Sequence, residues 1–303
     1  MITISTEKGL IKVDEWNDII ERPGFKQSLN PNEHELASIL GRYVFAEKVH
    51  CGLSNCGTPH TKGYIVATKD GNETNIGKDC GKNYFGVDFE LMARQFDRDM
   101  TEKENRDLLW NFTFQLEEFE TKIATLRSGE KGADWVHKHS QVLINPNPRM
   151  PLEVVRTMAA MVKTKSDVLR VQRQATEHEI ENEEALQNKK IARPYYIDEP
   201  VANILGIEAL YPENDLRKLL VLELEEKIKT FKSKKIDEMT FEELSKWKKW
   251  AVSVDLTLET ASTTTRYGQE LLSHKNLVPL LKVIEKGQDQ DLFRNYLETI
   301  RDE

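Results

Sequence analysis

All three cysteines of this chain lie in one stretch, HCGLSNCGTPHTKGYIVATKDGNETNIGKDCG, which runs from His50 to Gly81. Together with one histidine they form the pattern C-x4-C-x3-H-x19-C, whose members are Cys51, Cys56, His60 and Cys80. Zinc in proteins prefers four thiolate or imidazole ligands, supplied by a tight turn and by a second element that returns to it. The pattern therefore predicts a zinc site with these four ligands.

The elements predicted around the cysteines fit such a site. Residues 63–68 and 73–76 flank an Asp70-Gly71 turn, which indicates a β-hairpin. A helix is expected to begin near Asp79, so that Cys80 lies at a helix N-terminus, where a thiolate is favoured. A cysteine-bearing turn, a hairpin and a ligand-bearing helix follow one another in the order of a treble-clef zinc module.

Three thiolates and one imidazole would fill a tetrahedron, which favours a structural over a catalytic metal. The alternatives are that the cysteines are small buried side chains, or that His50 is the fourth ligand. Neighbouring residues of a strand point to opposite faces, and this favours His60 over His50. The zinc-deaminase pattern and H-E-x-x-H are absent from the sequence.

The chain is acidic, with a net charge of −8, and no third of it is basic. Phosphate-binding proteins depend on clustered Lys and Arg, so the composition argues against nucleic-acid binding as the main role. No apolar run reaches the roughly 18 residues of a membrane span, and residues 1–16 do not read as a signal peptide. We therefore expect a soluble protein of the cytoplasm, where an odd number of cysteines is reduced.

The hydrophobic pattern predicts an α+β protein that is mostly α. A small N-terminal zinc-stabilised module (1–98) should contain a strand at Ile2 to Ser5 and helices near 14–21 and 32–44. A helical hairpin or arm (99–190) should follow, and then a C-terminal helical domain (191–303). The helical expectations are a stripe from Leu109 to Leu126, a helix from Leu152 that continues beyond Leu169 with a polar surface, and helices near 215–234, 240–260, 278–286 and 289–301.

Two further groups of residues have a chemical interpretation. His137, His139 and Asn145 could serve a metal-dependent nuclease or hydrolase, although loops commonly carry such residues. The segments KSKK (232–235) and KWKKW (246–250) bring lysine and tryptophan together, as does a nucleic-acid contact. The simpler interpretation of 246–250 is an amphipathic helix with a buried tryptophan and solvated lysines.

The stretch CGLSNCGTPHTKGYIVATKDGNETNIGKDCGKNYFG resembles a zinc module of phage and prophage proteins, in which Cys-Gly, His-x-x-Gly-Tyr, Gly-x-x-Cys-Gly and an aromatic-Gly pair recur. The resemblance covers residues 51–86. An N-terminal module followed by long helices is also similar to phage-encoded inhibitors that wrap bacterial defence complexes, such as those acting against Gabija. This resemblance implies a protein partner in a bacterial host cell.

The sequence thus favours a non-enzymatic protein, stabilised by Zn²⁺, that self-associates or binds a protein partner through its long helices. The second hypothesis is a nucleic-acid-binding zinc protein, because four lysines lie near the predicted hairpin: Lys62, Lys69, Lys78 and Lys82. The third is a metal-dependent nuclease or hydrolase. No membrane association is expected.

Overall fold

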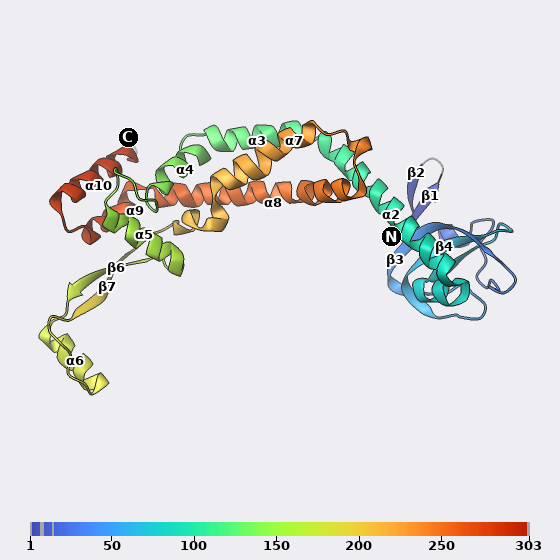
Figure 1. Ribbon diagram of the computed structural model, residues 1–303, viewed down its shortest axis with the longest axis horizontal. Coiled ribbons are helices and arrows are strands. Elements are labelled where there is room, and N and C mark those ends of the chain that lie inside the picture. The colour runs from blue at the N-terminus through green and yellow to red at the C-terminus, as the bar shows by residue number, and fades with distance from the viewer. Residues whose placement is uncertain (1, 7–8, 14, 302–303) are drawn as a thin grey trace. The chain divides into compact units, whose positions relative to one another are not determined.

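The structure of the protein is a computed structural model that describes residues 2–6, 9–13 and 15–301. Helix accounts for 57% of it and strand for 18%, which confirms the expected α+β class with mostly α structure. The chain divides into two compact units, residues 1–108 and 109–303, and helix α2 (Lys78–Thr113) runs from the first into the second (Figure 1). The threefold division at residues 98 and 190 stays a prediction. No helix among the described residues is long and apolar enough to cross a membrane.

The first unit is built on a five-stranded antiparallel sheet with the order β2-β1-β3-β4-β5. Its strands are β1 (Ile2–Thr6), β2 (Gly9–Val13), β3 (Leu36–His50), β4 (Pro59–Thr68) and β5 (Glu73–Gly77). The expected N-terminal strand and the hairpin around Asp70-Gly71 are both confirmed, and Gly71 adopts the positive φ that such a turn requires. A four-residue helix, α1 (Asn17–Ile20), lies within the helix expected at 14–21; Asp14 itself lies outside the described residues.

The helix expected at 32–44 is wrong, because this segment belongs to strand β3. Burial along the strand alternates, with Ile39, Gly41 and Tyr43 inside and their neighbours more exposed, and this is the period of a strand. The residues just before the strand form a local turn: the backbone N–H of Asn32 donates to Asn30 Oδ1 at 3.1 Å. Pairing with β1 and β4 provides hydrogen bonds that a single helix would have to supply within itself.

Both faces of the sheet are covered by apolar side chains. One face shares its core with α2, and that cluster includes two of the cysteines: Leu29, Ile39, Cys51, Leu53, Tyr64, Val66, Ile76, Cys80, Phe89 and Ala93. The opposite face buries Ile2, Ile4, Ile19, Tyr43 and Ile65. Consecutive residues of β4 thus contribute to opposite cores, which fixes the register of this strand.

Helix α2 confirms the expected start near Asp79, and it is interrupted at Gly86. Gly86 has φ 68° and ψ −147°, a conformation outside the helical range that suits glycine. The stripe from Leu109 to Leu126 is divided between two helices rather than one, because α2 ends at Thr113 and α3 (Leu116–Ser128) starts after a turn.

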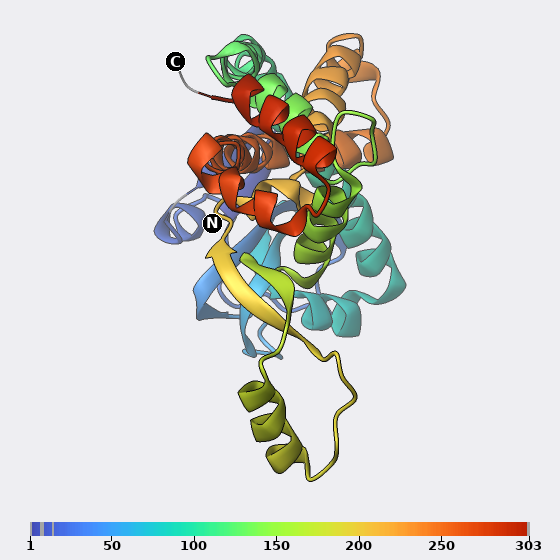
Figure 2. The same cartoon turned by 90° about the vertical axis from the view of Figure 1, so that its left-hand side faces the viewer.

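The second unit consists mainly of helices packed around α8 (Phe241–Leu271), with α4 and the segment before α7 in contact with it (Figures 1 and 2). The other helices are α4 (Ala133–Gln141), α5 (Leu152–Thr164), α6 (Glu177–Gln187), α7 (Glu226–Lys232), α9 (His274–Leu277) and α10 (Gly287–Thr299). A π-helical segment (Arg217–Glu225) leads into α7, and 3-10 turns occupy 207–210, 212–214, 236–238 and 278–283. Helix α8 begins with a capping box, in which Thr240 and Glu243 each bond the other's backbone N–H.

The long polar helix expected beyond Leu169 is wrong. Helix α5 ends at Thr164, and Val168–Gln174 forms strand β6, which pairs antiparallel with β7 (Tyr196–Asn203). Helix α6 then lies at the outer end of this two-stranded ribbon (Figures 1 and 2). The side chains of β6 favour a helix locally, but pairing with a strand more than twenty residues away stabilises the extended conformation more. A local sequence pattern does not reveal this pairing.

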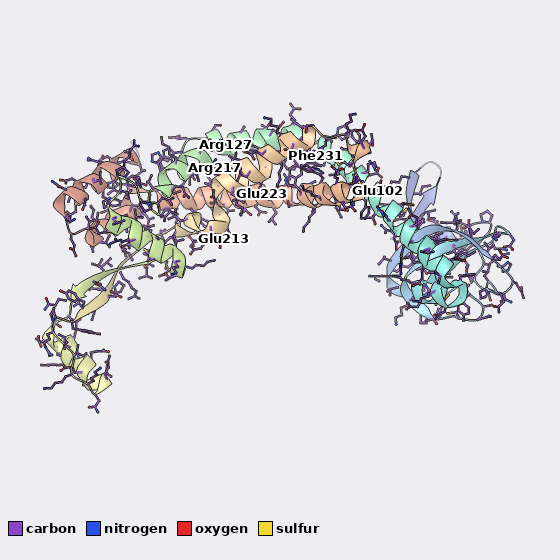
Figure 3. The ribbon with its side chains drawn as sticks, in the orientation of Figure 1. Glu102, Arg127, Glu213, Arg217, Glu223 and Phe231 are labelled. Carbon is purple, nitrogen blue, oxygen red and sulfur yellow. The ribbon has the colours of Figure 1, made fainter. Side chains whose placement is uncertain are left out.

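Four aromatic side chains form the core at one end of the helical unit. Phe231 and Trp250 contact each other, and both contact Phe112 and Trp247, with ring centroids 5.2 to 5.8 Å apart; Figure 3 labels Phe231. Both tryptophans are less than a tenth exposed, whereas the lysines beside them are exposed. The amphipathic interpretation of residues 246–250 is therefore confirmed.

Candidate metal centre

The three cysteines meet at one point of the first unit. Cys51 follows β3 directly, Cys56 lies in the turn that leads to β4, and Cys80 lies in the first turn of α2. Their sulfur atoms all lie within 4.8 Å of one another, and the Cys56 and Cys80 sulfurs are 3.2 Å apart. The expected order of turn, hairpin and helix is therefore present, and it brings together the residues most distant in the pattern.

The backbone around the first two cysteines forms a tight turn held by its own hydrogen bonds. The N–H of Cys51 donates to Thr58 O at 3.1 Å, and the N–H of Cys56 donates to Leu53 O at 3.1 Å. Gly52 is required here, because a Cβ at this position would lie 2.1 Å from Thr74 Oγ1 on β5. Close packing against β5 thus fixes the turn on the sheet.

Backbone amides face two of the sulfurs. The N–H groups of Leu53 and Gly77 donate to the Cys51 sulfur, and that of Thr58 donates to the Cys56 sulfur. Such donors stabilise negative charge on sulfur, and they recur where a turn presents a thiolate to a metal. The role of Thr58 as a donor was not predicted from the sequence, although its position two residues after Cys56 could have indicated it.

Burial and hydrogen bonding act in opposite directions on the thiols. Burial raises the pKa of Cys51, and it raises the pKa of Cys80 to about 12. Burial also acts against ionisation of Cys56, but hydrogen bonds from Thr58 and from the other two cysteines outweigh it, and the pKa of Cys56 lies below its usual value. Three thiolates so close together in an apolar pocket would repel one another and would be poorly solvated, whereas a bound dication would compensate their charge. The donor set therefore fits a thiophilic metal such as zinc.

The structure does not bring His60 to the sulfurs. Its Nε2 lies 2.5 Å from the Tyr43 hydroxyl and its Nδ1 lies 3.0 Å from Thr58 O, so both ring nitrogens have partners. His50, the alternative ligand, has its Nδ1 2.9 Å from Gly57 O and is also outside the sulfur cluster. His60 as the fourth ligand stays a prediction.

The bond between Tyr43 and His60 belongs to a buried polar group. Asn75 Nδ2 donates to the Tyr43 hydroxyl at 3.2 Å and to His50 O at 2.8 Å. Burial raises the pKa of Tyr43, so this phenol stays protonated over the ordinary pH range. The arrangement satisfies a phenol that β3 places in the core, and this need was not evident from the sequence.

The residues considered for a nuclease do not come together. His137 Nδ1 lies 4.0 Å from Asp215 Oδ1, the ring of His139 contacts that of Trp135 with centroids 4.8 Å apart, and Asn145 Nδ2 donates to Gln141 O at 3.0 Å. Within residues 2–6, 9–13 and 15–301, the three-cysteine cluster is the one group of His, Cys, Asp and Glu side chains arranged to hold a metal.

Two of the four lysines near the hairpin are already paired. Lys69 forms an ion pair with Glu35, and Lys82 forms one with Glu90 at 3.2 Å. Lys62 and Lys78 line a pocket of about 540 Å³ together with Arg42, Asp97 and Glu104, of which Arg42 is paired with both carboxylates. The charge available to a phosphate backbone is therefore smaller than the sequence suggested.

No protein-family model matches this chain, and neither a curated protein nor a solved structure matches it.

Proposed function

We propose that this chain is a non-enzymatic protein-interaction protein whose N-terminal unit is stabilised by a structural Zn²⁺. The observation that carries the proposal is the convergence of the three sulfurs from a turn and a helix N-terminus, with backbone N–H groups donating to two of them. When bound, zinc would cross-link the turn, the sheet and α2 through Cys51, Cys56 and Cys80. Reduced cysteines are a condition of such a site, which agrees with a cytoplasmic protein.

The metal would act on folding rather than on a substrate. Cys51 and Cys80 are less than a tenth exposed and belong to the same core cluster as Phe89 and Ile76. Part of the core of this unit of about 108 residues consists of thiols. A metal that binds these thiols only in the folded state therefore stabilises the unit.

The interaction role is assigned to the helical unit because of its exposed apolar side chains. Phe114 is 83% exposed and Leu186 82%, and Val252 and Leu256 lie one turn apart on the outer surface of α8 at 63% and 66%. Clustered exposed apolar residues on a helix are typical of a surface that another protein covers. The proposed partner is a second copy or another protein, and the resemblance to phage proteins makes a bacterial defence complex the first to test.

Elemental analysis of the reduced, purified protein tests the metal. We expect about one zinc per chain in the wild type and a large loss in Cys56→Ser and Cys80→Ser. Lys82→Ala, an exposed position in the same turn of α2 as Cys80, is the control and should retain zinc. Wild-type protein that refolds to its full helix content without binding zinc at micromolar concentration would contradict the proposal.

Light scattering after size-exclusion chromatography and capture from a bacterial lysate test the interaction. The proposal expects either a mass above that of the 35.1 kDa monomer or a specific captured protein. A strict monomer that captures nothing would refute the interaction role and leave the metal site standing.

A further inference from the structure

A groove between α8 and α7, together with the end of the segment before α7, has an aromatic floor and a basic rim. It has a volume of about 570 Å³ and is lined by Leu222, Glu226, Lys227, Thr230, Lys246, Trp247, Lys249, Trp250 and Ser253. Trp250 is held in place because its Nε1 donates to Glu223 O at 2.9 Å; Glu223 is labelled in Figure 3. The groove is thus pre-formed, with one side made of packed tryptophan rings.

The apolar surface of the groove continues along α8. Leu222 is 43% exposed at its edge, and Leu256 lies seven residues after Lys249 on the same face of the helix. A strip of exposed apolar side chains that runs on from an aromatic groove has the form of a site for an amphipathic helix.

The rim of the groove has positive charge that no partner in the described part of the chain neutralises. Among the residues that the structure describes, Lys246 and Lys249 form no ion pair, whereas Lys227 is paired with Glu223. Glu226 is the one acidic side chain of the lining. The occupant that this charge favours is therefore acidic.

Helix α6 of this same chain has the complementary properties. It has glutamate at positions 177, 179, 181, 183 and 184, no lysine or arginine, and an 82% exposed Leu186. Glu183 and Leu186 are three residues apart and lie on one face, so acidic and apolar groups are presented together. No residue of α6 lines the groove of its own chain.

Helix α6 is held rigid although it buries little. An isolated helix of eleven residues is marginal in water, yet this one has a capping box of Thr176 and Glu179. Arg193 on the returning loop pairs with Glu177 at 3.0 Å and Glu184 at 3.1 Å. Ile180 is its one buried residue. A pre-ordered helix loses less entropy on docking, which favours association.

We propose that α6 of one copy docks in the groove of a second copy, with Leu186 against the tryptophan floor and with Glu181 and Glu183 facing Lys246 and Lys249. The inference rests on the proposed interaction function and names a second copy as the partner. It requires α6 and the edge of the groove to be accessible in the single chain: Leu186 is 82% exposed and Leu222 is 43% exposed.

Leu186→Ser is the direct test, because an exposed leucine contributes nothing to the fold that its loss would disturb. Sedimentation of wild-type protein over a range of concentrations should show association. The variant should raise its dissociation constant tenfold or more, which is the loss expected when one buried leucine anchor is removed. Leu91→Ser, at a 58% exposed leucine of α2 outside the helical unit, is the matched control and should leave the dissociation constant unchanged.

Charge reversal tests the pairing itself. Lys246→Glu with Lys249→Glu, and separately Glu181→Lys with Glu183→Lys, should each weaken association, and an equimolar mixture of the two variants should restore it. Lys163→Glu, on α5, is the charge control. A wild type that is monomeric at 100 µM, or a mixture that stays dissociated, would overturn the inference.

The outcomes separate this inference from the proposed function. Zinc-loaded wild type that is monomeric but captures another protein would refute docking between copies and support the proposed function. Self-association that neither Leu186→Ser nor the charge reversals affect would place the contact elsewhere, and would also refute the inference.

Discussion

Removal of the metal should loosen the N-terminal unit while the helical unit stays folded. The lower end of the apparent binding energies of structural zinc sites, about 10 kcal/mol, corresponds to a dissociation constant of roughly 50 nM. At about 5 µM free zinc, binding to the folded state alone would then stabilise it by about 2.7 kcal/mol. Chelation should therefore shift the opening equilibrium of this unit about a hundredfold.

Hydrogen exchange of the full chain measures this shift at separate sites. The amides of Tyr64 to Val66 on β4 lie in the register that pairs with Thr74 to Ile76 on β5, next to the turn that carries the cysteines. We expect them to exchange about a hundredfold faster after treatment with a zinc chelator. The amides of α8, in the other unit, are the internal control and should not change.

The pH dependence of zinc binding follows from the thiol protons. Because burial holds the pKa of Cys51 above its usual value and raises that of Cys80 to about 12, both are protonated at pH 7 without metal. Zinc must displace these protons, so each unit by which the pH falls should weaken apparent binding by up to about tenfold per thiol. Calorimetry in buffers of different ionisation enthalpy would count the protons released.

Two results would refute this reasoning. The first is equal amide protection of β4 and β5 with and without metal, since the sulfurs would then be ordinary buried thiols. The second is a Cys80→Ser variant with the zinc content of the wild type, because a ligand from α2 is what joins the helix to the turn.

Three further predictions concern single side chains. His60→Ala should lose about 1–3 kcal/mol of stability, because the buried Tyr43 hydroxyl loses a partner. Elemental analysis of the same variant tests the predicted fourth ligand: loss of zinc would make His60 a ligand, and full retention of zinc would exclude it. Gly268→Ala should lower the free energy of unfolding in urea by about 1–2 kcal/mol, because the new Cβ would lie 2.0 Å from Val136 Cγ1 and this clash outweighs the helix preference of alanine. Adding Val136→Ala should restore part of that stability. A Gly268→Ala variant more stable than the wild type would contradict this packing argument. Burial and the neighbouring Lys138 lower the pKa of His139 in the folded protein, so the unfolded chain binds a proton more readily below about pH 6.5. Thermal stability should therefore fall as the pH drops below about 6.5, and His139→Gln should flatten that dependence. An unchanged pH profile in this variant would show that another group titrates.

Local chemistry made several parts of the fold predictable from sequence. The Asp70-Gly71 hairpin was predictable because its turn needs a positive φ, which the structure shows at Gly71. The cap of α8 was predictable because Thr240 and Glu243 satisfy each other's backbone N–H groups. The break in α2 was predictable because Gly86 has a positive φ, which glycine adopts readily.

Long-range pairing accounts for the expectations that failed. Residues 36–44 and 168–174 contain enough helix-forming side chains to suggest helices, but each is a strand because a distant segment pairs with it. The candidate metal site also has one part that local sequence predicts and one part that depends on distant contacts. Spacing identified the cysteines, whereas the orientation of His60 depends on Tyr43, which β3 brings beside it.

By itself the sequence determined the fold class, the cysteine cluster and the turns, because these depend on composition and on neighbours within a few residues. Only the tertiary structure decided which segments are strands, how His60 is oriented and which lysines remain unpaired. It also decided that the tryptophans of 246–250 form the floor of a groove while α6 stays exposed. These properties depend on contacts between residues far apart in the chain, whose energies no local pattern contains.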